Sequence, residues 1–202
     1  MIAEIGGTGI RLKFSFVAAV TLMLYFCEER VVLVTFLASI IHESGHLILM
    51  SIYRVPVKNI ELGAFGICIE RTEVSFAGYK KEALIALGGI AFNLIACLLS
   101  WLLYAAVSKE ALMLFAAVNL LVALFNSLPS FFLDMGRAVG FLLLTVFSEE
   151  RTEKITACIS AFTALMLDAV LIVYTVFIGF NVSLLAVTVY LNLLTFKRKV
   201  EK

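Results

Sequence analysis

Two histidines and a glutamate stand together in Ile41-His42-Glu43-Ser44-Gly45-His46-Leu47, which has the pattern H-E-x-x-H. Residues four apart in an α-helix lie on one face, so a helical segment projects both imidazoles to the same side. Zinc binds such a pair through two nitrogens at about 2.0–2.1 Å and keeps room for a third ligand and a water molecule. Glu43 is placed to take a proton from that water. The pattern predicts a zinc site, and the alternative is a hydrogen-bonded structural cluster.

The composition places these residues in a membrane protein. The chain has 202 residues, of which 62% are hydrophobic and 15% are charged, whereas soluble domains carry about 25% charged residues. A soluble protein of this length could not bury so much apolar surface. An ionisable cluster inside a bilayer costs at least about 2.5–3.5 kcal/mol per charged residue, which favours a functional role for it. The chain has no basic stripe that would indicate a nucleic-acid partner. The partner we expect from composition is the lipid bilayer.

Six apolar segments approach the length of about 20 residues that a membrane-spanning helix needs. Charged residues separate most of them, and no linker to a second soluble domain follows. We therefore predict a single membrane-embedded domain over residues 1–202, with its core at about residues 31–147. The six predicted transmembrane helices cover residues 12–27, 31–53, 83–107, 111–147, 155–178 and 182–196.

The distribution of lysine and arginine predicts the orientation of these helices. We assign 14 of the 16 basic residues, including Lys13 and Arg137 inside predicted segments, to the side of the termini and even-numbered loops, and only Arg30 and Lys109 to the other side. Cytoplasmic loops carry the excess of lysine and arginine, so both termini are expected in the cytoplasm. The predicted location is the cell membrane, crossed several times.

The connection between the second and third predicted helices is too polar to span a membrane. Its apolar residues alternate at Ile60 and Leu62 and again at Ile67 and Ile69, with turn residues at 63–66 between them. This pattern predicts a β-hairpin at the cytoplasmic face. The predicted fold class is an all-α polytopic membrane protein with about six transmembrane helices and one small β-hairpin.

A third zinc ligand is expected from one of the two aspartates, Asp134 and Asp168. Asp134 follows Pro129, where a helix should break. A broken helix inside a membrane is tolerated where it lines a cavity or is buried in protein. Asp168 lies in a continuous apolar stretch, where helix packing or a snorkelling contact accounts for it. We favour Asp134 as the third ligand, with one zinc ion per chain.

Three segments share their order and spacing with known motifs. His42-Glu43-Ser44-Gly45-His46 matches H-E-x-x-H; Asn126…Pro129…Leu133-Asp134-Met135-Gly136-Arg137 is similar to N-x-x-P…L-D-G-G-R; and Gly88-Gly89-Ile90-Ala91-Phe92-Asn93 is similar to G-P-x-x-N. Over about residues 39–140 the chain therefore resembles the site-2 protease family of intramembrane zinc metalloproteases. Within this family, the chain resembles the compact bacterial branch typified by the stage IV sporulation protease. Met135 replaces a glycine of the family pattern and Ile90 replaces a proline, but neither change removes a ligand or the base.

The resemblance implies a zinc metalloendopeptidase with His42, His46 and Asp134 as ligands and Glu43 as general base. It also implies a membrane-embedded or membrane-associated protein substrate. A helical substrate must unwind before its peptide bond is attacked. Asn93 and Asn126 are candidate polar partners for the unwound backbone, or else simple ties between helices.

Three alternatives remain at this stage. A catalytically inactive relative that binds membrane client proteins would share the fold but would not need Glu43. A divalent-metal transporter would use histidine and aspartate at mid-membrane, yet would rarely need a glutamate between two helical histidines. A membrane zinc protease of another family would take a glutamate as third ligand, for which Glu110 or Glu149 is available. The sequence assigns no oligomeric state.

Overall fold

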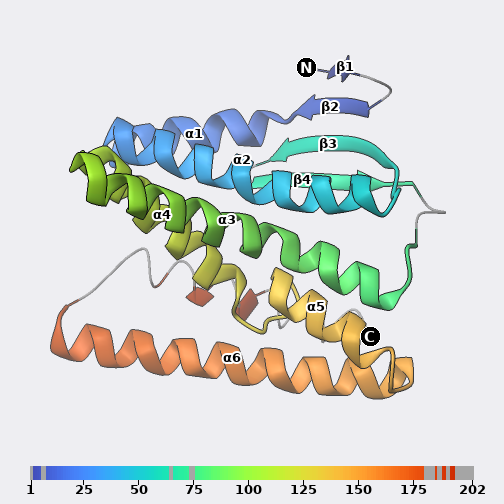
Figure 1. Cartoon of the computed structure of the whole chain (residues 1–202). Helices are drawn as coiled ribbons and strands as arrows, with labels where there is room; N and C mark the ends of the chain where they lie inside the picture. The colour runs from blue at the N-terminus through green and yellow to red at the C-terminus, as the bar shows by residue number, and fades with distance from the viewer. Residues whose placement is uncertain are drawn as a thin grey trace. The chain divides into compact units, whose positions relative to one another are not determined.

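The computed structural model of the chain describes residues 2–5, 8–63, 66–72, 76–179, 185, 188–189 and 192–193. The fold divides into two compact units, Met1–Phe125 and Asn126–Lys202, so the expectation of one domain stays a prediction. The elements, drawn in Figure 1, are β1 (Ile2–Ile5), β2 (Thr8–Leu12), α1 (Phe14–Phe26), α2 (Glu29–Ile52), β3 (Val57–Gly63), β4 (Gly66–Arg71), α3 (Tyr79–Val107), α4 (Glu110–Asn126), α5 (Asp134–Leu143) and α6 (Glu149–Phe177).

Helices occupy the first five predicted transmembrane segments. Three of them, α2, α3 and α6, are long and apolar enough to cross a membrane. α1 has 13 residues and α4 has 17, which at 1.5 Å per residue gives about 20 and 25 Å, less than the roughly 30 Å of a bilayer core. The sixth predicted segment, 182–196, lies largely outside the described residues, as does the C-terminus.

The predicted break in the fourth apolar segment is confirmed. α4 ends at Asn126 and α5 begins at Asp134, with residues 127–133 between them in non-helical conformation. Pro129 lies in the middle of this stretch. Proline removes a backbone donor and disfavours a helical conformation of the residue before it, which accounts for the break.

The predicted hairpin is confirmed and belongs to a larger sheet. β3 and β4 pair antiparallel with Ile60 opposite Ile69, and the residues at the turn, 64–65, lie outside the described part of the chain. The sheet has the order β1-β2-β3-β4. β2 pairs parallel with β3, with Ile10 opposite Ile60, and β1 pairs antiparallel with β2. The two N-terminal strands were not expected from the sequence.

Charged contacts hold the sheet to the start of α1. The Glu61 carboxylate on β3 accepts from Lys13 Nζ at 2.6 Å and from Arg11 Nη1 at 3.4 Å. The hydrogen bond from Lys13 lowers the pKa of Glu61 below its ordinary value, and the Arg11 guanidinium acts in the same direction. β4 is tied to α3 in a similar way, since Arg71 pairs with the buried Glu82.

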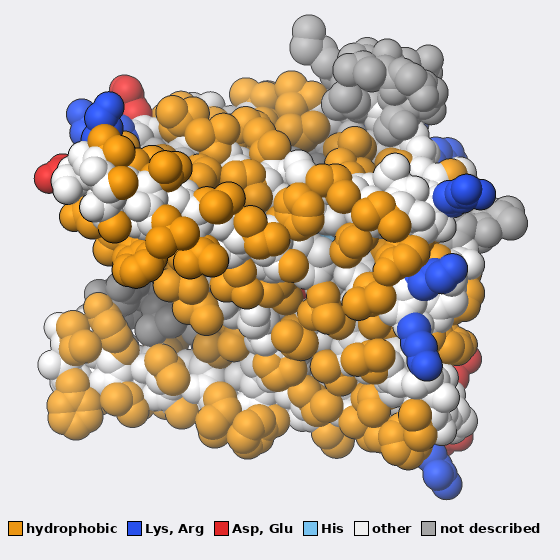
Figure 2. Space-filling view, viewed as in Figure 1, with side chains coloured by type: hydrophobic (Ala, Val, Ile, Leu, Met, Phe, Trp, Pro, Cys, Tyr) orange, Lys and Arg blue, Asp and Glu red, His pale blue; other side chains and the backbone are white. Residues whose placement is uncertain are grey.

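Apolar packing joins the sheet to α2 and α3. Met50, Val55 and Ile85 form a buried cluster, against which residues of β3 and β4 also pack. In contrast, the outer faces of the long helices carry large exposed apolar side chains, such as Leu98 and Trp101 of α3. Figure 2 shows hydrophobic side chains over most of the visible helix surface, with lysines and arginines gathered near helix ends. Such a surface is suited to lipid rather than to water.

Candidate metal centre

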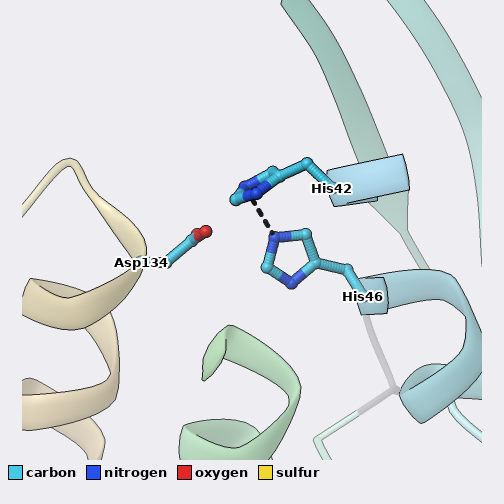
Figure 3. Close-up of side chains that lie close together, drawn as sticks. All are labelled: His42, His46 and Asp134. Carbon is cyan, nitrogen blue, oxygen red and sulfur yellow. Dashed lines mark hydrogen bonds between the residues drawn. The ribbon is translucent and has the colours of Figure 1, made fainter. Parts of the chain in front are cut away.

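α2 carries both histidines of the H-E-x-x-H segment. The helix is unbroken from Glu29 to Ile52, so residues 42 and 46 are one turn apart and project to the same side (Figure 3). Both side chains are buried, with 6% of His42 and 5% of His46 exposed, and their ring centroids lie 5.0 Å apart. The helix therefore brings two imidazoles to one buried point.

A backbone carbonyl on α3 sets the protonation of His46. The ring atom Nδ1 lies 2.7 Å from the carbonyl oxygen of Ile85. A carbonyl oxygen only accepts hydrogen bonds, so Nδ1 is the donor and carries the proton. Nε2 of the neutral ring then presents its lone pair, which is the form that binds a metal.

A side-chain amide does the same for His42. Nδ1 of His42 lies 2.7 Å from Oδ1 of Asn93 on α3. The Asn93 amide nitrogen donates to the carbonyl oxygen of Ala38 at 3.0 Å and to Oδ1 of Asn119 at 2.8 Å. These two acceptors identify the nitrogen end of the amide, so its oxygen faces His42 and accepts from Nδ1. Nε2 of His42 presents its lone pair as well.

The distance between the two Nε2 atoms fits a shared zinc ion. They lie 3.4 Å apart, along the dashed line in Figure 3. Two nitrogens bound at about 2.0–2.1 Å to one tetrahedral zinc are about 3.3–3.4 Å apart. Two facing lone pairs repel each other unless a cation lies between them. The protonation and the spacing of His42 and His46 thus both fit a bound divalent metal.

Gly89 of α3 leaves space beside the two nitrogens. A Cβ atom added at Gly89 would lie 2.6 Å from Nε2 of His46 and 2.7 Å from Nε2 of His42, which is closer than real Cβ contacts. Gly45 and Gly88 also face each other where α2 crosses α3, and a Cβ on either would collide with the backbone of the other. Glycines therefore allow the close crossing of these helices and keep the ligand nitrogens accessible to an ion.

In the second unit, Asp134 is the first residue of α5. It is buried, with 6% of the residue exposed, and its Oδ1 lies 3.8 Å from Nη1 of Arg137 one turn later. The preceding Leu133 has an extended backbone with φ −100° and ψ 161°. The non-helical stretch after α4 therefore ends at Leu133, and α5 begins with Asp134.

Contacts with α6 and a close backbone approach hold the segment before Asp134. The backbone N–H of Phe131 donates to Oγ of Ser160 at 2.9 Å, and Leu133 N–H donates to the carbonyl of Ser130 at 2.9 Å. A Cβ atom at Gly136 would overlap the carbonyl oxygen of Ser130. The segment can fold back on α5 in this way only because residue 136 is glycine.

The three predicted ligands satisfy the distance requirement for one ion. His42, His46 and Asp134 each offer one ligand atom, and these atoms lie within 4.8 Å of one another (Figure 3). Two imidazole nitrogens and one carboxylate oxygen are a donor set typical of catalytic zinc, which keeps a fourth position for water or substrate. This set of residues could bind a metal ion.

Comparisons with known proteins rest on structure alone. A scan against known protein families finds no match, and a search of curated proteins finds no similar sequence. A search of solved structures finds the site-2 protease from Methanocaldococcus jannaschii, with a TM-score of 0.71 and 18% sequence identity. The match covers 98% of this chain and 94% of that one. The chain has the site-2 protease fold.

The site-2 protease fold is that of a polytopic membrane protein, in agreement with the apolar helices. In a membrane, polar groups need partners within the protein. Near the histidines this condition is met on α2 itself, where the hydroxyls of Thr35, Ser39 and Ser44 each donate to the carbonyl four residues earlier. The helix therefore carries its polar residues without a break.

Two residues that differ from the site-2 protease motifs fit the fold without distortion. Ile90, where the motif has proline, is buried inside α3, which runs unbroken from Tyr79 to Val107. Met135, where the motif has glycine, is half-buried, and the position that needs glycine is the next one, Gly136. Neither difference displaces a candidate ligand.

The remaining predicted residues occupy different environments. Glu43 is half-buried on α2, between the two histidines, and Asn126 is the last residue of α4. Asn93 has no exposed surface, and its hydrogen bonds go to His42, Ala38 and Asn119. Its expected role in substrate binding stays a prediction, which these contacts do not favour.

The glutamates considered as alternative third ligands lie at helix starts. Glu110 begins α4 and Glu149 begins α6, and both are exposed. Among the described residues, the histidines cluster with Asp134 rather than with either glutamate. Sequence reasoning missed Gly89 and Asn119. Gly89 stands inside a motif that was recognised, so its place in that motif was a usable signal, whereas nothing about Asn119 pointed to the site.

Proposed function

We propose that this protein is an intramembrane zinc metalloprotease of the site-2 type. The observation that carries the proposal is the histidine pair: both Nδ1 atoms are held as donors, and the two Nε2 atoms are 3.4 Å apart beside Gly89. The cluster with Asp134 and the likeness of fold support the same assignment. Zinc bound there would polarise the scissile carbonyl and lower the pKa of its water to about 7.

Under this proposal, three residues bind the metal and a fourth transfers protons. His42, His46 and Asp134, which are all buried, would hold one zinc ion. Glu43 takes a proton from the attacking water through its carboxylate and delivers it to the leaving amine. The peptide bond of the substrate is thereby broken, with one new carboxylate and one new amine as products.

The substrate we propose is a membrane-embedded or membrane-tethered protein, cleaved by regulated intramembrane proteolysis. The exposed apolar helix faces support a site that lies within a bilayer. A helical substrate has all its backbone groups paired, so it must unwind before attack. Asn126, next to the break between α4 and α5, is proposed to contact the unwound backbone.

We further propose that both termini of the chain lie in the cytoplasm. The excess of lysine and arginine in the termini and even-numbered loops supports this orientation. The parallel pairing of β2 with β3 supports it for the N-terminus, because it puts that strand and the hairpin on the same side. Reporter fusions at each end test the orientation.

The deciding experiment compares variants of the full chain, reconstituted in lipid vesicles with a membrane-tethered substrate. Glu43→Gln should keep its zinc and lose about 10²–10⁴ in cleavage rate, the usual contribution of a general base. His46→Ala should lose zinc as well. Ser44→Ala is the matched control on the same turn, since the Ser44 hydroxyl only donates to Ile40 of its own helix. Cleavage at the wild-type rate by Glu43→Gln would exclude the proposed hydrolysis.

The same experiment separates catalysis from client binding. A catalytically inactive client-binding protein would retain the substrate without any cleavage in the wild type. Zinc content is measured by elemental analysis of each variant. A wild-type protein that contains no zinc after reconstitution with zinc salts would contradict the metal centre itself.

A further inference from the structure

A chain of buried amide groups connects three helices of the first unit to His42. Asn93 on α3 and Asn119 on α4 both have 0% of their surface exposed. Asn93 Oδ1 accepts from Nδ1 of His42, and its amide nitrogen donates to Asn119 Oδ1 at 2.8 Å. The amide nitrogen of Asn119 donates to the carbonyl oxygen of Phe115 at 2.8 Å. The series of hydrogen bonds thus runs from α4 through α3 to α2.

Backbone carbonyls fix the direction of every hydrogen bond in this series. Phe115 C=O accepts from the nitrogen of Asn119, so the Asn119 oxygen must face Asn93. Ala38 C=O likewise accepts from the nitrogen of Asn93. Rotating the Asn93 amide by half a turn would set its oxygen against the Ala38 carbonyl oxygen and Oδ1 of Asn119. Only one orientation satisfies the network, and in it His42 Nδ1 must be the protonated nitrogen.

We propose that Asn93 and Asn119 are positioning residues that hold His42 in the tautomer whose Nε2 binds the metal. The inference rests on the proposed metal centre and goes beyond it, because it assigns control of that ligand to α3 and α4. The two histidines differ in this respect. His46 is held by a backbone carbonyl, which no substitution removes, whereas His42 is held by side chains. A substitution of the hydrogen-bond partner can therefore change the tautomer of His42 but not that of His46.

A purely structural role of the two asparagines predicts a different outcome. Buried amides that only tie helices together would affect unfolding when removed, and would leave the His42 tautomer and the zinc affinity unchanged. A positioning role predicts that both change, and that any substitute able to accept from Nδ1 preserves the tautomer. Outer hydrogen-bond partners of metal ligands typically contribute 10–100-fold to metal affinity.

The test uses the full chain in lipid or detergent, with two readouts. Nitrogen-15 NMR of the imidazoles reports the tautomer in metal-free protein, where only His42 and His46 contribute signals. Competition with a chelator reports zinc affinity. Asn93→Leu should lose the Nδ1-protonated form of His42 and about 10–100-fold in zinc affinity. His46 should stay protonated on Nδ1 in every variant, because the Ile85 carbonyl holds it, and this provides an internal control.

Two further variants keep the proposal testable if Asn93→Leu fails to fold. Asn93→Asp keeps an oxygen that accepts from Nδ1, so it should preserve the tautomer, although it loses both hydrogen bonds that the Asn93 nitrogen donates. Asn119→Leu removes one of the two acceptors that orient Asn93 and should produce the same change as Asn93→Leu, but smaller. Ser100→Ala is the matched control, since Ser100 is also buried on α3 and donates only to Ala96 of its own helix.

The result that overturns the proposal is an unchanged His42 tautomer together with unchanged zinc affinity in folded Asn93→Leu. If that variant does not fold, the same unchanged pair in Asn119→Leu, or a lost tautomer in folded Asn93→Asp, overturns it. Failure of the proposed function looks different. In that case the wild type binds no zinc or cleaves nothing, while the tautomer of His42 in metal-free protein still responds to Asn93.

Discussion

His42 and His46 belong to an unbroken 24-residue helix, whereas Asp134 starts a ten-residue helix after a break. The histidines are positioned by helix periodicity, by hydrogen bonds to their Nδ1 atoms and by a glycine beside their Nε2 atoms. The aspartate is positioned by the backbone path of the residues around it. The helix sets the backbone spacing of the ligand pair, while the place of a ligand after a break depends on how the segment before it is held.

The largest effect on the site is expected from Gly89→Ala, which tests how His42 and His46 are positioned. The added Cβ would lie 2.5–2.7 Å from atoms of both rings, so the two Nε2 atoms could no longer approach a common ion. We expect zinc affinity to fall by more than the 10–100-fold that loss of an outer hydrogen-bond partner causes. Chelator competition measures this. Gly140→Ala is the control, because the nearest atom to a Cβ there is at 3.8 Å. Normal zinc binding by Gly89→Ala would contradict the described geometry.

An intermediate effect is expected from Gly136→Ala in the aspartate half. A Cβ at residue 136 would overlap the Ser130 carbonyl, so the segment before α5 must move and carry Asp134 with it. The histidine pair stays intact, so zinc binding should weaken by about 10–100-fold rather than disappear, and cleavage should be lost. Zinc titration and the vesicle cleavage assay measure the two effects. Met135→Gly is the control at the neighbouring position and should leave zinc affinity roughly unchanged; equal damage by both variants would mean that Gly136 has no special role.

The smallest effect is expected from Ser160→Ala. This change removes the acceptor of the Phe131 backbone N–H, at a cost of about 1 kcal/mol for one partly buried hydrogen bond. The midpoint of thermal unfolding should fall slightly, and zinc affinity should fall a few-fold at most. Thr145→Ala, an exposed residue whose hydroxyl donates within its own turn, is the control. If Ser160→Ala weakened zinc binding as much as Gly89→Ala, the two halves of the site would not differ in the way described.

The features that the sequence predicted correctly are those set by local rules. The spacing of His42 and His46 requires only that the segment is helical, and the break before Asp134 follows from Pro129. The β3–β4 hairpin follows from alternation over a short stretch with glycine at the turn. The apolar segments also predicted the positions of the long helices, because membrane-spanning length is a local property.

The features that the sequence did not predict depend on contacts between distant residues. β2 pairs with β3 across the intervening helices α1 and α2, and no local pattern encodes that pairing. Asn119 contributes to the site through Asn93, which depends on how α3 and α4 lie against each other. Gly89 stands in a recognised motif, but its importance becomes visible only where α2 crosses α3.

The parallel pairing of β2 with β3 also affects how the chain is assembled. During synthesis β2 leaves the ribosome before α1 and α2, and its partner strand emerges only after both helices. Until both helices and β3 have been synthesised, β2 can therefore pair only with β1. An insertion error that left residues 8–12 on the opposite side of the membrane would prevent this pairing altogether. Completion of the sheet thus requires that residues 8–12 and the β3–β4 hairpin reach the same side.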